Sequence, residues 1–82
     1  MNDSMFSGVW RDPALHVELL RAMERHPPFG AGRDLALDAI HAALVPTHRR
    51  RHKGAAKLTR SAVEKRVEEL VDTRHEVRAL AA

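Results

Sequence analysis

Apolar positions recur at helical spacing in three stretches of the chain, and Pro- or Gly-containing segments separate them. The first stretch follows Asp12 and Pro13. This pair is typical of a helix start, because aspartate accepts free backbone N–H groups and proline at the first helical position has no N–H to satisfy. Apolar residues then recur every four positions, and a proline pair after His26 ends the pattern. We therefore predict a first helix over residues 12–26.

The second stretch covers residues 33–45, after a Gly-containing turn at residues 29–32. Asp34 lies in its first turn, where a negative charge interacts favourably with the helix dipole. Pro46 is expected to end this helix, because an interior proline removes a backbone hydrogen bond. Residues 47–57 contain Gly54 and almost no apolar residue. We expect them to form a basic loop or a short exposed turn of helix.

The third stretch is predicted to be a helix capped by Thr59, because Leu58 and Val63 then occupy the two positions of a hydrophobic staple. Ser61 and Glu64 form a competing capping box, which we consider second. After Val71 two continuations are open. The chain could turn into a short strand over residues 76–80, or the helix could continue toward the C-terminus.

These elements predict an all-α or mainly α fold, with a flexible arm over residues 1–11 and one helical domain over residues 12–82. The aromatic residues of the arm either pack onto the domain or stay in a frayed terminus. A chain of 82 residues buries only a modest core. We therefore expect a homodimer, to which the spare apolar residues Phe6, Trp10 and Val77 would contribute.

The composition limits the cellular setting. The chain has no cysteine, which excludes disulfides and thiolate metal ligands and suits a reducing compartment. No apolar run approaches the length of a membrane span, and residues 1–10 lack the pattern of a signal peptide. We expect a cytoplasmic protein that does not enter the membrane.

Positive charge is concentrated in one part of the chain. Residues 46–66 hold eight of the 14 Lys and Arg residues and a single acidic residue, Glu64, so this segment is strongly basic although the whole chain carries only +3. Such a field favours a polyanion, and we expect double-stranded DNA. The predicted phosphate contacts are Arg49, Arg50, Arg51, Lys53 and Lys57, and the predicted base contacts are Arg60, Ser61 and Lys65.

Residues 58–71, with the sequence LTRSAVEKRVEELV, resemble the recognition helix of winged-helix and helix-turn-helix regulators. The resemblance implies a three-helix, helix-turn-helix-like domain with a small C-terminal wing. It also implies that Arg60, Ser61, Lys65 and Glu64 face DNA while Val63, Val67 and Leu70 face the core. The link from the second helix is longer than in those families, and the glycine expected before the wing is missing. The function expected is that of a transcriptional or recombination regulator of bacterial or phage origin.

Two other classes of function compete with this prediction. The basic strip could dock on an acidic protein, as in a phage-encoded inhibitor or an antitoxin-like adaptor, or the chain could bind RNA. Enzyme activity is not expected, because no Cys nucleophile, glycine-rich phosphate loop or compact Ser-His-acid set is present. His48 and His52 have metal-ligand spacing, but arginines and a lysine surround them, so phosphate contact is the better role and no metal or cofactor is predicted.

The C-terminal residues suggest a second property. The final Ala-Leu-Ala-Ala is similar to the end of the bacterial tag that directs stalled translation products to the ClpXP protease. The resemblance implies that Leu80, Ala81 and Ala82 form a degron and that ClpXP is a partner. Chance in an alanine-rich sequence is the alternative explanation.

Overall fold

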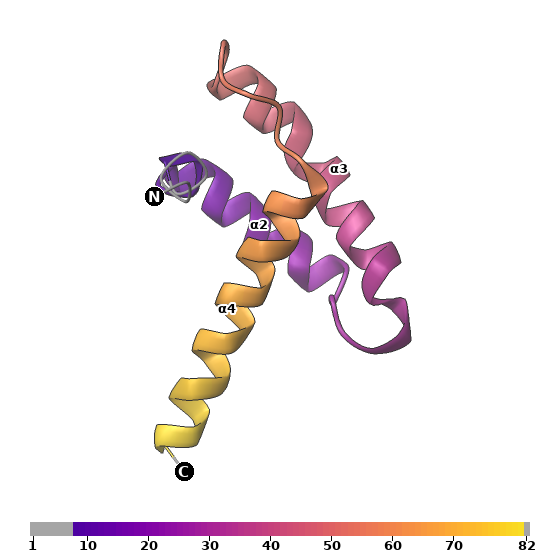
Figure 1. Ribbon diagram of the computed structural model, residues 1–82, viewed down its shortest axis with the longest axis vertical. Helices are drawn as coiled ribbons and strands as arrows, with labels where there is room; N and C mark the ends of the chain where they lie inside the picture. The colour runs from indigo at the N-terminus through magenta and orange to yellow at the C-terminus, as the bar shows by residue number, and fades with distance from the viewer. Residues whose placement is uncertain (1–7, 82) are drawn as a thin grey trace.

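The computed structural model describes the backbone of residues 8–81 and the side chains of residues 8–71, and it is helical throughout its regular parts. Residues 8–10 are helical, and the elements that follow are α2 (Pro13–Arg25), a 3₁₀ turn η1 (Gly30–Gly32), α3 (Arg33–Arg51) and α4 (Arg60–Ala81). Figure 1 shows α2 and α3 packed together and α4 running downward past both of them. No strand occurs among residues 8–81, which confirms the all-α fold class.

The start and the end of α2 agree with the sequence prediction. The Asp12 side chain accepts a hydrogen bond from the backbone N of Ala14 at 3.0 Å, and Pro13 is the first helical residue. The N–H of His26 closes the last turn by donating to the carbonyl of Ala22 at 2.8 Å. Local capping chemistry therefore determines both ends of this helix.

The predicted turn between the first two helices is also present, as η1. Gly30 has a φ of +69°. This left-handed conformation is unfavourable for residues that carry a side chain, so glycine suits the position. This glycine lets the chain reverse after α2 and enter α3 directly.

The predicted end of the second helix at Pro46 is wrong. α3 continues through Pro46 for another turn and a half, to Arg51. Pro46 cannot donate to the carbonyl of Ala42, but both residues are exposed, so water can solvate that carbonyl. Thr47 and His48 on the opposite side are buried, at 9% and 5% exposure, so continuation of the helix adds packed surface. Tertiary packing therefore outweighs the local cost of the proline. Of the predicted loop over residues 47–57, only residues 52–57 lie outside the helices.

α4 begins where Thr59 was expected to cap it, since the Thr59 hydroxyl accepts a hydrogen bond from the N–H of Ala62 at 3.1 Å. Leu58 and Val63, the two staple positions, are both buried in the core. Of the two continuations after Val71, the structure shows the helix. Residues 72–81 extend α4, so the small wing implied by the resemblance does not form there.

One hydrophobic core joins the helices, and it includes Trp10 from the N-terminal segment. Trp10 is 9% exposed and Val9 packs against the same cluster, so this part of the predicted arm belongs to the folded unit. Phe6 and the rest of residues 1–7 lie outside the described part of the chain. Trp10 is therefore not one of the spare apolar residues invoked for a dimer. The core residues are Trp10, Leu15, Leu19, Ala22, Leu37, Ile40, Leu44, Leu58, Ala62, Val63 and Val67.

Candidate nucleic-acid interface

The cations of the basic segment fall into separate groups according to their partners, and Arg51 belongs to the paired group. Its guanidinium donates two hydrogen bonds to the Asp12 carboxylate, at 2.8 and 3.1 Å. His52 donates from Nε2 to the same carboxylate at 2.9 Å. Arg51 and these other donors hold the pKa of Asp12 down at about 2. Asp12 thus joins the start of α2 to the end of α3, and Arg51 serves this junction.

Arg60 is also paired, at the seam between α3 and α4. Its guanidinium contacts the carboxylates of Asp38, Asp34 and Glu64. The hydrogen bond that Arg60 donates to Asp38 is the main reason that the pKa of Arg60 rises above its usual value. A guanidinium held in this way must leave three carboxylates before it can read a base edge.

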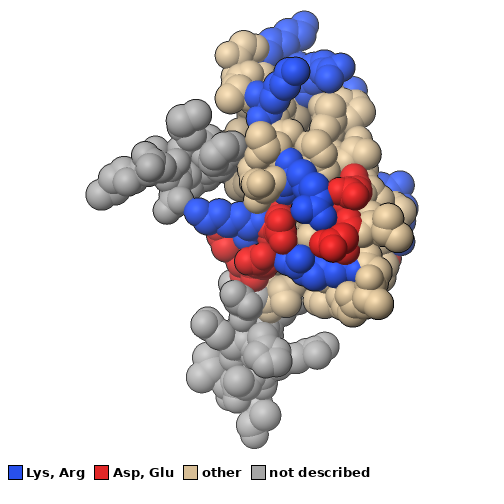
Figure 2. All heavy atoms as spheres, turned by 45° about the vertical axis from the view of Figure 1, so that its right-hand side comes forward, with Lys and Arg blue, Asp and Glu red and all other residues tan. Residues whose placement is uncertain are grey.

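The same seam contains a second set of ion pairs that extends further along α4. Arg33 donates to Glu64 and to Glu68, both at 3.0 Å. Positions 60, 64 and 68 therefore form the face of α4 that lies toward α3. Figure 2 shows this region at mid-height, where acidic and basic side chains are interleaved. Part of the charge in the first two turns of α4 is thus used in ion pairs with the rest of the protein.

The two other predicted base contacts point elsewhere on α4. Ser61 and Lys65 are both exposed. Lys65 has an interaction partner of its own. The outer face of α4 therefore offers a hydroxyl and an ammonium, without the Arg60 guanidinium that the sequence placed beside them.

Four predicted phosphate contacts form a different group, which we call the cationic end. Arg49 and Arg50 lie in the last turn of α3, and Lys53 and Lys57 lie in the following loop. All four are exposed, and none forms an ion pair with a carboxylate among the described side chains. In Figure 2 the top of the molecule, where α3 ends, shows basic side chains with no acidic ones among them. The carbonyl end of a helix favours such residues in its last turn, so the cationic end is compatible with a stable α3.

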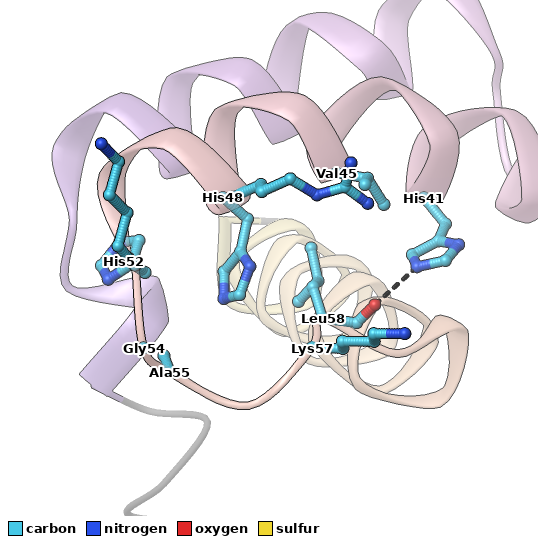
Figure 3. Close-up of a pocket in the computed structure, with 10 residues that line it drawn as sticks. His41, Val45, His48, His52, Gly54, Ala55, Lys57 and Leu58 are labelled. Atoms are coloured by element: carbon cyan, nitrogen blue, oxygen red, sulfur yellow. Dashed lines mark hydrogen bonds between the residues drawn. The ribbon is translucent and has the colours of Figure 1, made fainter.

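A pocket of about 480 Å³ opens beside the cationic end, between α3 and the loop that leads to α4. Figure 3 shows His41, His48 and His52 on the α3 side and Gly54, Ala55 and Lys57 on the loop side. His41 donates from Nε2 to the carbonyl of Leu58 at 2.7 Å, a bond that fixes the loop against the helix. The lining residues are His41, Val45, His48, Arg49, His52, Lys53, Gly54, Ala55, Lys57 and Leu58.

Two of the three pocket histidines, His48 and His52, are stacked on each other. The rings of His48 and His52 have centroids 5.3 Å apart and planes within 20° of parallel. Burial lowers the pKa of His48 below its usual value, and the electrostatic effect of the His52 ring lowers it further. The sequence pattern did not indicate this arrangement, because the second helix was predicted to end at Pro46. The spacing of residues 41, 48 and 52 would have indicated one helical face if α3 had been extended.

The predicted degron and Val77 lie at the C-terminal end of the chain, where the structure describes the backbone of α4 but not the side chains. The degron residues Leu80 and Ala81 belong to α4, but their side chains, Ala82 and the Val77 side chain lie outside the described part. Within the described residues, no group of three or more His, Asp or Glu side chains is arranged to hold a metal ion. No helix in the described range has the length and apolar character needed to cross a membrane.

Comparison with known proteins adds no assignment. No protein-family model matches the chain, and searches of curated proteins and of solved structures give no significant match.

Proposed function

We propose that this protein binds double-stranded DNA, with the cationic end (Arg49, Arg50, Lys53 and Lys57) contacting the sugar–phosphate backbone. The observation that supports it is that these four exposed cations have no carboxylate partner among the described side chains. Unpaired cations keep their hydration and their mobile counterions. Contact with phosphates releases the counterions condensed on DNA, which supplies most of the free energy of non-specific binding.

The contribution of α4 to this interface is smaller than the sequence alone suggests. Arg60, the residue best suited to read guanine, is held by Asp38, Asp34 and Glu64. Ser61 and Lys65 are the base contacts that remain in the proposal. Backbone contacts therefore dominate, and the protein binds many sequences with similar affinity. Within this proposal, it acts as a regulator of transcription or recombination by occupying DNA, without catalysing a reaction.

A titration of labelled random duplex DNA, followed by fluorescence anisotropy, tests the proposal. At about 50 mM salt, replacing Arg50 by Gln removes one phosphate contact and should weaken binding about 15-fold. Arg25→Gln is the matched control, because Arg25 is an exposed arginine at the end of α2 and the charge change is the same. Equal affinity of the two variants, or the absence of binding by the unmodified protein, would refute the proposal.

Association with another protein through exposed apolar side chains is the second candidate. Leu35 is 78% exposed and Phe29 is 57% exposed, both near the start of α3. Large exposed apolar side chains are common where proteins associate. They lie at the opposite end of α3 from the cationic end, so a protein partner that uses them would tolerate Arg50→Gln but not Leu35→Asp. DNA binding should show the reverse pattern.

A further inference from the structure

The pocket beside α3 contains a buried polar atom that the protein itself does not satisfy. His48 is 5% exposed, and its Nε2 has no hydrogen-bond partner among the described residues. His16 Nδ1 and Arg66 Nε are unsatisfied in the same way, but neither residue lines this pocket. A buried donor or acceptor without a partner has lost its hydration without compensation, so each such atom in a folded protein calls for an explanation. The position of His48 on the pocket wall indicates that a ligand supplies the missing partner.

The charges around the pocket favour an anionic ligand. Arg49, Lys53 and Lys57 contribute to its lining, and no Asp or Glu does. An imidazole N–H at Nε2 can donate to a phosphate oxygen, and nearby ammonium and guanidinium groups can complete the coordination. Phosphate is the biological anion that best matches several converging donors of this kind.

The size and the apolar part of the lining indicate more than a free phosphate ion. About 480 Å³ is within the range of pockets that hold small organic molecules. Val45, Ala55 and Leu58 provide apolar surface, and the stacked rings of His48 and His52 provide a flat one. A planar base could lie on such a surface while its phosphate reaches the cations.

We propose that this pocket binds an organic phosphomonoester of mononucleotide size, with His48 and Lys57 contacting its phosphate. Figure 3 shows both residues at the pocket, on opposite sides of it. The ligand shares Arg49, Lys53 and Lys57 with the cationic end but does not require Arg50, which is not part of the lining. The pocket therefore does not depend on DNA binding, and the two proposals can fail separately.

Titration of the full chain with AMP, inorganic phosphate and adenosine at low salt tests this inference, with the ring nitrogen signals of the histidines followed by NMR. AMP should shift the His48 signal saturably, with a dissociation constant below about 1 mM. Inorganic phosphate and adenosine, which each lack half of the ligand, should bind at least tenfold more weakly. No saturable AMP shift, or equal affinity for AMP and either fragment, would overturn the proposal.

Two variants separate this site from the DNA surface. His48→Phe keeps the ring and its packing but removes the nitrogen, so AMP affinity, read from the backbone amides of the loop, should fall at least tenfold while DNA affinity is unchanged. Arg50→Gln should do the opposite. If His48→Phe does not fold, Lys57→Gln, at an exposed loop position, should still weaken AMP binding at least fivefold. A loss of DNA affinity in His48→Phe, with AMP binding intact, would mean that a DNA phosphate occupies the pocket and would also overturn the proposal.

Discussion

The salt dependence of DNA binding should report how many cations the fold leaves free. The basic segment contains eight Lys and Arg residues, but the cationic end contains four without carboxylate partners among the described side chains. Each phosphate neutralised contributes about −0.9 to the slope of log K against log salt concentration. Four contacts therefore give a slope of about −3.6, whereas eight would give about −7.2.

The two slopes are easily distinguished in one experiment. Between about 50 and 200 mM salt, four contacts predict a loss of affinity of about 150-fold, and eight predict about 20,000-fold. Anisotropy titrations at four salt concentrations measure the slope. Arg50→Gln should reduce it by about 0.9, and Arg60→Gln should leave it unchanged because Asp38, Asp34 and Glu64 already hold that guanidinium. A slope near −7, or a decrease in the Arg60 variant equal to that in the Arg50 variant, would refute the assignment of paired and free cations.

Three further predictions concern the fold. Leu44→Ala should lower the free energy of unfolding by about 2–5 kcal/mol in urea titrations, since Leu44 is fully buried, and Leu35→Ala on the same helix should change it by less than about 0.5 kcal/mol; similar losses would mean that α3 buries a different face. Thr59→Ala should cost about 1 kcal/mol by the same assay and Ser61→Ala close to nothing, because Thr59 caps α4; the reverse order would favour the competing capping box. The pKa of Asp12 is lowered from 3.8 to about 2, so its charge stabilises the folded protein above pH 3.8 and this stabilisation is lost as the pH falls toward 2. Asp12→Asn keeps a capping side chain but should flatten the unfolding profile over that interval, and an unchanged profile would contradict the role of the carboxylate.

Much of the helical layout could be predicted because it depends on neighbouring residues. Asp12 with Pro13 starts α2, and Thr59 with its staple starts α4. Gly30 marks the turn between α2 and α3. The end of the second helix was placed wrongly at Pro46. The hydrogen bond that proline removes is a local cost, whereas the packing that compensates for it involves residues from other helices. The burial of Thr47 and the position of Pro46 and Ala42 on the exposed side of the helix allow α3 to continue.

The candidate site was only partly predictable for a related reason. The concentration of positive charge in residues 46–66 is visible in the sequence, but the partners of two of its arginines are distant. Arg51 meets Asp12 across 39 positions, and Arg60 meets Asp38 across 22. A count of charges within a segment cannot include carboxylates that folding brings from elsewhere.

The sequence by itself determined the helix starts, the all-α class and the place where positive charge is dense, since each follows from residues close together in the chain. Only the tertiary structure decided which cations are free, how far α3 extends and that three histidines line a pocket. These properties depend on distances between residues far apart in the sequence, because ion pairing and burial act through space.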